Sequence, residues 1–555
     1  MRNYKKLQLL LLTSLGILTY SCQNDDNEIT PQNTAEEQNY LNSENEDGVI
    51  KLGEKLENPY TVENMRQALE NLKKSNKSAK SLTDEIEITT THLYVKFIPK
   101  TENELDILKK DSTLILYGYP LDYEIEEGGY FYRDPEVPQN QPTYQYAAIK
   151  VDKELPNEIE NEILEELFIP DEDSDLENKT SKKSVTYQMV DALVDEALRI
   201  TNNLETTLQN KNLKTTRSKW RPAGTIKVWD DVVRNFIGVE GVKVRARRWF
   251  TTHRGIANAT GYYSCDGRFR RKANYSIDWE RYQFALQDGW LNGATYNGPK
   301  KRGDWNLDLN SGKQEYYATI FSGAYFYYYG TRMGLTSPPK NSFWKRQMKI
   351  KARLERGKSS YVKARRIWLG SDISLKAYGE SSAAVFGTTI HELAHAAHRE
   401  LSGAAYNHLV YYAYTIPCAT LIDECDFPRQ EARSKRRVME TWATTVEIIL
   451  TNNRYRTKFS RPNYEYFENF QTQTIAADNF YTTAGIDMID DVNQRLDILP
   501  PSNFRPLDNV FGYTINQLEN GLRGAKSWIE WRDNIKNGSN NPTQNFVDEL
   551  FNNWN

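Results

Sequence analysis

The hydrophobic pattern divides the chain into a β-rich part and a helical part. Between residues 92 and 151, short alternating runs typical of strands are interrupted by a helical segment at 102–110. Alternating runs separated by Gly and Asn turns return at 221–290. From about residue 300, apolar residues recur at the three- and four-residue spacing of amphipathic helices. We therefore predict a multidomain α+β protein.

The same pattern places the boundaries between these regions. Residues 23–85 are acidic, rich in asparagine and poor in large apolar side chains, which predicts a disordered tether in which 61–75 could form a short helix. The stretch PDEDSDLENKTSKKS has the composition of a linker. The predicted order is a small α+β domain at 86–170, a linker and helix at 171–220, a small β-sandwich at 221–290, and a mostly helical domain with an edge-strand sheet at 300–555.

Two local patterns predict how side chains are oriented. In VKVRARR, residues 242–248, apolar and basic residues alternate, which indicates a strand with one solvated face rather than a patch for nucleic acid. The run YYATIFSGAYFYYYG, residues 316–330, predicts an aromatic-rich helix packed in the core, although its tyrosines could also line a sugar site.

The first 22 residues have the pattern of a targeting segment. Three basic residues precede an apolar run at 7–18 that is too short to cross a bilayer, and Ser21 and Cys22 follow it. This resembles a bacterial lipoprotein signal, which implies lipidation of Cys22. The acidic QNDDNE that follows resembles the surface-export signals of Bacteroidota lipoproteins. We expect a surface-exposed lipoprotein of the outer membrane, attached by lipid alone, since no later run approaches the length of a membrane helix.

Composition narrows the classes of partner. The 555 residues carry a formal net charge of −4 and a pI near 6.1, so no nucleic-acid partner is expected. Besides Cys22 the chain has Cys265, Cys418 and Cys425, an odd number without paired CxxC spacing, which does not favour a zinc ribbon or a disulfide scaffold. Whether Cys418 and Cys425 pair is left open.

The candidate metal-binding and catalytic residues are concentrated in one stretch, TTIHELAHAAHREL, residues 388–401. His391 and His395 are four residues apart, so on a helix they lie about 40° apart on one face and can hold one metal ion. Glu392 lies beside them, where it can accept a proton from a metal-bound water. Three protein ligands leave the fourth position of a tetrahedral zinc ion open for that water, whose pKa zinc lowers to about 7.

The segment before this helix has the pattern of a strand. IWLGSDISLKAYG, residues 367–379, leads through a turn into the HELAH helix. Over roughly residues 300–555 this arrangement resembles zincin metallopeptidases, in which an edge strand beside the active-site helix pairs with the extended substrate backbone. The same region also resembles the zinc-dependent metalloproteinase lipoproteins of Bacteroidota. The sandwich resembles the accessory modules of such extracellular enzymes and could contact glycans.

The third metal ligand is not contained in the HELAH stretch. The metzincin pattern HExxHxxGxxH is excluded, because His398 and Leu401 stand where it requires Gly and His. His398 lies a further turn along the helix, where it would leave a poorly enclosed metal. Its other roles would be hydrogen bonding to a ligand, substrate contact or a polar helix face. The remaining pattern is that of gluzincins, in which a glutamate on a later helix completes the site.

Glu440 is the glutamate that we predict. In RRVMETWATTVEIIL, residues 436–450, Glu440 stands beside an apolar stripe at helical spacing, and the small Ala443 and Thr444 would allow the two helices to approach. The alternatives that the sequence leaves open are Glu424, Glu431 and Glu447, of which only Glu447 shares the face of Glu440.

These residues and the resemblance predict a surface zinc endopeptidase that hydrolyses proteins or glycoproteins. Zinc would be held by His391, His395 and Glu440, with Glu392 as the general base. A group that stabilises the developing oxyanion is also required, and the candidates are Tyr411, Tyr412, Tyr414 and His408. The alternative is a surface glycan- or protein-binding lipoprotein whose aromatic sandwich does the binding and whose zinc site is structural or vestigial.

Overall fold

The computed structural model describes residues 48–75, 87–138, 140–170, 187–204, 218–288, 293–342, 345–361, 371–414, 426–466, 473–475 and 480–554. Helices and sheets both occur in several units, consistent with the predicted α+β class. The predicted signal segment with Cys22 lies outside the described residues, as do Cys418, Cys425 and Glu424. Cys265 is a buried free thiol.

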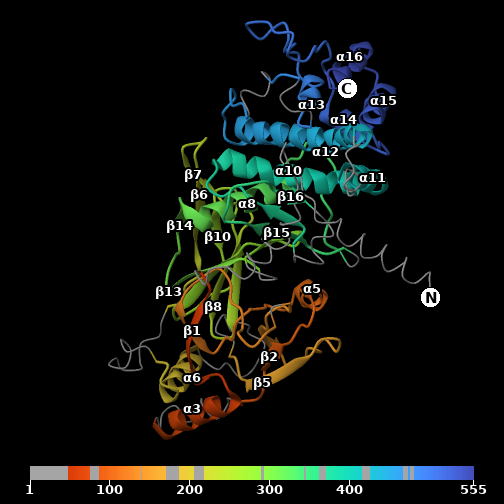
Figure 1. Cartoon of the computed structure of the whole chain (residues 1–555). Helices are drawn as coiled ribbons and strands as arrows, with labels where there is room; N and C mark the ends of the chain where they lie inside the picture. Colours follow the sequence, from red (N-terminus) through yellow and green to blue (C-terminus); the bar gives the residue numbers. More distant parts are fainter. Residues whose placement is uncertain are drawn as a thin grey trace, which may run out of the picture.

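The N-terminal unit contains two small sheets and three helices (Figure 1). One sheet has the order β4-β2-β5 and the other pairs β1 with β3. Helices α3 and α6 pack against each other at the end of the molecule far from the C terminus. The elements are β1 (Lys51–Lys55), α3 (Val62–Ser75), β2 (His92–Phe97), α5 (Glu102–Lys110), β3 (Tyr123–Glu127), β4 (Gln145–Lys150), β5 (Asn161–Leu167) and α6 (Tyr187–Ile200).

Residues 48–75 are folded, so the predicted tether at 23–85 extends too far. The helix expected at 61–75 is confirmed as α3, and its Met65, Ala68 and Leu69 share a hydrophobic core with Leu193 and Val194 of α6. The prediction failed because the apolar face of α3 is narrow and its partner helix lies more than 100 residues later in the chain.

Two four-stranded sheets follow, and their hydrophobic side chains share one core. One sheet is ordered β10-β6-β14, with β7 also paired to β6, and the other is ordered β13-β11-β8-β9. Their strands continue to residue 309, beyond the expected end of the sandwich at 290. The strands are β6 (Ala223–Asp230), β7 (Asn235–Gly238), β8 (Lys243–Arg248), β9 (Thr251–Ile256), β10 (Tyr262–Ser264), β11 (Ala273–Asp278), β13 (Thr295–Lys301) and β14 (Leu307–Leu309).

The basic face of β8 is covered, so the prediction of a solvated face is wrong. Val244 and Ala246 are buried in the core as expected. On the opposite face, Arg245 Nη1 donates to the carbonyl oxygen of Leu116 at 2.8 Å, and Arg247 Nη1 donates to that of Leu121 at 3.1 Å. The N-terminal unit therefore packs on this face of the sheet, and the arginines satisfy its free backbone carbonyls.

The predicted motif helix lies between two other helices, above a third four-stranded sheet. This sheet has the order β12-β15-β17-β16, with β16 antiparallel to β17. Helix α10 packs against both α8 and α12 (Figure 1). Helix α8 is the expected aromatic helix, and most of its tyrosines are buried. The elements are β12 (Phe284–Gln287), α8 (Gly312–Tyr329), β15 (Met348–Ala352), β16 (Ser360–Tyr361), β17 (Ile373–Leu375), α10 (Ser382–Leu401), α11 (Gly403–Tyr414) and α12 (Asp426–Asn453).

The strand expected at 367–379 forms only in part and is not at the edge. It appears as β17, which lies between β15 and β16, while residues 362–370 lie outside the described residues. The edge strand beside α10 is β16 instead. Residues 360–361 cover the edge of β17, a pairing that alternation within one segment does not encode.

Short helices close the C-terminal end, where amphipathic helices were expected. α15 packs on α12 and contributes the buried Trp528 and Trp531 to the main core. The elements are a π-helical turn (Arg454–Lys458), α13 (Ala484–Asp487), α14 (Ile515–Gly521), α15 (Trp528–Gly538), a 3-10 turn (Gln544–Phe546) and α16 (Val547–Asn552).

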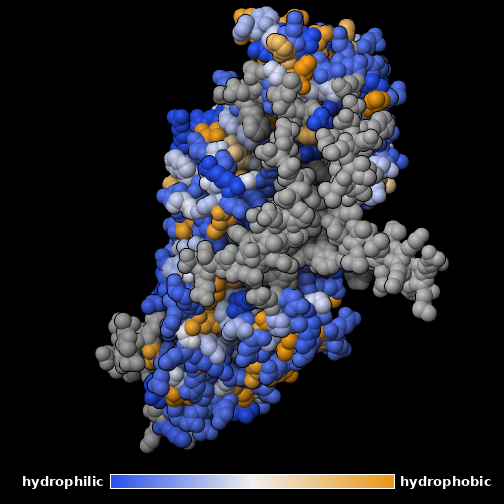
Figure 2. Space-filling model, in the orientation of Figure 1, coloured by the Kyte–Doolittle hydropathy of each residue, from blue (hydrophilic) through white to orange (hydrophobic). Residues whose placement is uncertain are grey.

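The visible surface is mostly hydrophilic. In Figure 2 the hydrophobic residues of this face are scattered among polar ones, a distribution common on protein surfaces. Within the described ranges, no helix has both the length and the apolar character needed to cross a bilayer.

Candidate metal centre

Helix α10 carries the histidines, and its two ends and its buried face fix its position. It starts after Ser381, whose hydroxyl accepts a hydrogen bond from the backbone N–H of Ala384 at 3.2 Å, and this caps the first turn. It ends where the Ser402 backbone N–H donates to the carbonyl oxygen of His398. Phe386, Ile390, Leu393 and Ala397 are buried. The apolar face thus fixes the rotation of the helix, and with it the direction of the histidines.

Helix α12 approaches α10 closely, partly because Gly387 has no side chain. A Cβ at Gly387 would lie 2.8 Å from Glu447 Oε1 and 2.5 Å from the hydroxyl of Tyr466. On the other side of α10, a Cβ at Gly323 of α8 would lie 2.9 Å from Cβ of Thr389. Two glycines therefore set the distances from α10 to its neighbours.

His391, His395 and Glu440 come together in this helix pair. One ligand atom of each lies within 4.8 Å of the others, and all three residues are buried. Glu440 Oε2 is 3.4 Å from His391 Nε2 and 3.4 Å from His395 Nε2. Among the residues described by the structure, this is the group of histidine, cysteine and acidic side chains that could hold a metal ion.

Glu447, one of the alternative ligands, contacts the ring of His391 instead. His391 Nδ1 donates to Glu447 Oε2 at 2.9 Å, and the hydroxyl of Tyr466 donates to Glu447 Oε1 at 2.9 Å. Such a contact fixes the ring so that Nε2 faces the cluster. Glu431, another alternative, is exposed and lies 3.5 Å from Lys435. The sequence showed that Glu447 shares the face of Glu440, but not that it contacts the far nitrogen of His391.

The cluster is strongly charged. Burial alone would lower the pKa of His391, but hydrogen bonds with Glu440 and Glu447 raise it to about 10. Burial would raise the pKa of Glu440, whereas His395 and His391 lower it well below its usual value. Burial lowers the pKa of His395. The carboxylates of Glu440 and Glu447 thus favour positive charge at His391.

Glu392 lies on the same helix and is only 2% exposed. Its charge acts on His391, raising the pKa of that ring. The nearby aromatic residue Tyr481 was not singled out from the sequence, and its ring centroid lies 6.2 Å from that of His391. Of the four residues predicted to polarise a carbonyl, Tyr412 contacts His408 and lies beneath Lys435.

His398 is separate from the cluster. It is 1% exposed, and its ring packs edge-on against Tyr406, with centroids 4.9 Å apart. Burial and the neighbouring His395 lower its pKa to about 3, so the ring is neutral. The three histidines of the stretch thus do not form one ligand set, and His398 packs as a neutral ring at the end of α10.

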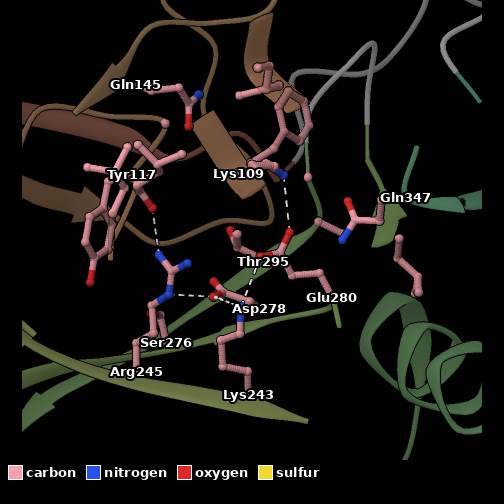
Figure 3. A pocket seen from close by; sticks show the side chains of 18 of the residues that line it. Lys109, Tyr117, Gln145, Lys243, Arg245, Ser276, Asp278, Glu280, Thr295 and Gln347 are labelled. Carbon is pink, nitrogen blue, oxygen red and sulfur yellow. Dashed lines mark hydrogen bonds and ion pairs between the residues drawn. The ribbon is translucent and has the colours of Figure 1, made fainter. Parts of the chain in front are cut away.

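A cavity of about 400 Å³ lies elsewhere, between the N-terminal unit and the sheet that contains β8 (Figure 3). Its charged residues pair with one another: Lys109 Nζ lies 3.2 Å from Glu280 Oε2, and Arg245 Nε lies 2.5 Å from Asp278 Oδ2. Burial would raise the pKa of Glu280, but these cations lower it well below its usual value. The cavity is a polar seam between units, and none of its lining residues belongs to the metal cluster.

Comparison of the chain with protein-family models, with curated proteins and with solved structures gave no match in any of the three. The class of site is therefore defined by its geometry alone. That geometry is a buried group of two imidazoles and one carboxylate that could bind a metal ion, with a further carboxylate on the same helix.

Proposed function

We propose that the chain is a zinc-dependent metallopeptidase of the gluzincin kind, with zinc held by His391, His395 and Glu440. The observation that carries the proposal is the pair of 3.4 Å separations between Glu440 Oε2 and the two histidine Nε2 atoms. Neighbouring ligands of a tetrahedral zinc ion with bonds of about 2.0–2.1 Å lie about 3.4 Å apart. Two imidazoles and one carboxylate are also a donor set of catalytic zinc sites that keep one position open.

The residues around the cluster suit peptide hydrolysis. A bound zinc ion would supply a Lewis acid that polarises the scissile carbonyl and lowers the pKa of a water molecule. Glu392 would accept the proton of the attacking water and pass it to the leaving nitrogen. Glu447 holds the ring of His391 in one tautomer and orientation. Tyr481 replaces the tyrosines of α11 as our candidate for stabilising the oxyanion, because its ring is close to His391.

As the resemblance to zincins implies, the substrate would bind in extended form beside α10. The strand β16 lies next to this helix and pairs with β17. Main-chain hydrogen bonds between a substrate and a strand hold a peptide irrespective of its side chains. We propose, as the sequence suggested, that the protein acts at the cell surface on proteins or glycoproteins, attached through lipid on Cys22.

The test compares the wild-type chain with Glu392→Ala. We expect the variant to keep its zinc, since Glu392 is not a ligand, and to lose at least about 100-fold of hydrolysis because the general base is gone. Hydrolysis is measured on protein, glycoprotein and peptide panels, and zinc by elemental analysis. Glu431→Ala is the matched control, because Glu431 is an exposed glutamate of α12 that should leave both properties unchanged.

Two results would count against the peptidase. One is wild-type hydrolysis in Glu392→Ala. The other is a zinc-loaded wild-type chain that binds members of the panels and cleaves none, which would support the glycan- or protein-binding alternative.

A further inference from the structure

Behind α12, a second group of buried oxygen atoms gathers that the proposed peptidase chemistry does not use. Asp487 is the last residue of α13, and Gln494 and Asp508 come from the loops that follow. Asp487 and Gln494 are fully buried, and Asp508 is 2% exposed. Buried carboxylates need a compensating partner, because removing a charge from water is costly.

Backbone hydrogen bonds hold these loops side by side. The Tyr513 N–H donates to the carbonyl oxygen of Met488 at 2.9 Å, and the Gly512 N–H donates to that of Ile489 at 3.4 Å. The side chain of Arg505 donates to the carbonyl oxygen of Gln494 at 3.4 Å. The segment that contains Asp508 therefore runs along the segment that contains Asp487 and Gln494.

The hydrogen bonds of the group leave two buried oxygens without donors. The hydroxyl of Thr483 donates to Asp487 Oδ2 at 2.6 Å, and the amide of Gln494 donates to Asp487 Oδ1. Asp508 Oδ1 accepts from the Val510 N–H at 2.9 Å. Gln494 Oε1, on the amide that contacts Asp487, and Asp508 Oδ2 are buried and receive no hydrogen bond from the described part of the chain. Unsatisfied buried acceptors of this kind indicate a missing partner.

The surrounding charges do not supply that partner. Burial, and next the carboxylate of Asp508, raise the pKa of Asp487 well above its usual value. Burial and the charge of Asp490 raise the pKa of Asp508 to about 8. The nearby cations are engaged elsewhere, since Arg495 and Arg505 donate to backbone carbonyl oxygens.

We propose that Asp487, Gln494 and Asp508 form a calcium site. The donors are carboxylate and amide oxygens without histidine or cysteine, which selects a hard cation over zinc or copper. Calcium accepts six to eight oxygens in flexible geometry, so backbone carbonyls and water can complete its shell, whereas magnesium usually keeps most of its water. A calcium ion would neutralise the two carboxylates and give both orphan oxygens a partner.

Such an ion would also stabilise the segment from Phe480 to Asp487, which lies beside the candidate zinc site. Thr441, next to Glu440, donates from its hydroxyl to the carbonyl oxygen of Phe480 at 2.9 Å. The same hydroxyl accepts from the Thr482 N–H at 3.2 Å. The chain from Phe480 to Asp487 therefore connects the calcium site to α12 and carries Tyr481 on the way.

The test is calcium binding by the full-length chain, freed of metal with a chelator and resupplied with one equivalent of zinc. We expect one calcium site by titration calorimetry, with a Kd below about 1 mM, and a Tm that rises with calcium. Without calcium, the raised pKa values predict that stability is lost as the pH rises from about 4 through about 8, because the folded carboxyls resist ionisation. Saturating calcium should remove that loss.

Asp508→Asn should bind calcium at least about tenfold more weakly. Its Tm without calcium should equal or exceed that of wild type, because the neutral amide avoids the cost of ionising one buried carboxyl. Asp533→Asn removes a partly exposed carboxylate of α15 and should respond to calcium as wild type does. The proposal is overturned if wild type shows no binding and no rise in Tm up to 10 mM calcium, or if Asp508→Asn keeps wild-type affinity. A fall in stability with pH that calcium leaves unchanged would show that the two carboxyls share a proton instead.

Discussion

At the scale of single residues, two glutamates of α12 have different contacts with one imidazole. Glu440 faces Nε2 of His391 at 3.4 Å, and Glu447 accepts from Nδ1 at 2.9 Å. The two are seven residues apart, which is two turns of helix and places both on one face. One face of α12 thus supplies both the expected ligand and the group that orients its neighbour.

Glu447→Gln should weaken zinc binding by about 10- to 100-fold, the usual effect of disturbing a partner of a ligating histidine. The amide keeps the size of the side chain but removes the negative charge that stabilises the Nδ1–H. Competition with a chromophoric chelator measures the affinity. Glu431→Gln makes the same change at an exposed position and should bind zinc as wild type does. Equal affinities in the two variants would show that Glu447 has no part in zinc binding.

The residues of the candidate site were predictable where the signal is local. The spacing of His391 and His395 is a property of a single helix. The apolar stripe beside Glu440 is likewise a property of a single helix. The contacts of Glu447 and Tyr481 could not be predicted, because they depend on how closely α12 and the segment after it approach α10.

At the scale of elements, the candidate metal centre depends on the spacing between α10 and its two neighbours. Gly387 faces Glu447 and Tyr466, and Gly323 faces Thr389. Neither position has a positive φ, so the need for glycine there comes from the close approach rather than from the backbone.

Gly387→Ala should lower the free energy of unfolding by about 1–3 kcal/mol, because its Cβ would overlap Glu447 and the hydroxyl of Tyr466. It should also weaken zinc binding by displacing Glu447 from His391. Gly403→Ala is the matched control, since a Cβ there has no heavy atom within 4 Å. Denaturant unfolding and zinc competition measure both variants. Wild-type values for Gly387→Ala would contradict the close approach.

Helical elements were predictable and sheet partners were not. The helices at 316–330, 388–401 and 436–450 were expected from apolar spacing and are present as α8, α10 and part of α12. Alternation identified strands but did not show which sheet each one joins. β12 falls in the sheet with β15, β17 and β16, whereas β13 and β14 extend the two earlier four-stranded sheets. Strand pairing is set by contacts that are distant in sequence.

At the scale of the whole molecule, the N-terminal unit is attached to the β-rich unit by buried cations. Arg247 is 3% exposed and donates to carbonyl oxygens of Leu121 and Trp249. Arg271 contacts Asp195 of α6 at 2.8 Å. The sequence could not reveal this, because an alternating basic strand has the same pattern whether its polar face meets water or another unit.

Arg247→Ala should destabilise the protein by about 1–3 kcal/mol, because it leaves buried carbonyl oxygens without donors. Its zinc content should not change, since the metal centre lies in a different unit. Arg302→Ala, at an exposed arginine of the same β-rich unit, should alter neither property. Thermal unfolding measures the stability and elemental analysis measures the zinc content. If Arg247→Ala is as stable as Arg302→Ala, the hydrogen bonds of Arg247 contribute nothing to stability.

The central claim is that two helices supply three zinc ligands, and the zinc content of Glu440→Ala tests it most directly. The wild-type chain should contain one zinc ion per molecule by elemental mass spectrometry. Glu440→Ala should contain close to none after dialysis against a weak chelator, while its circular dichroism spectrum remains that of wild type. A full equivalent of zinc in Glu440→Ala, or none in the wild-type chain supplied with zinc, would contradict the account.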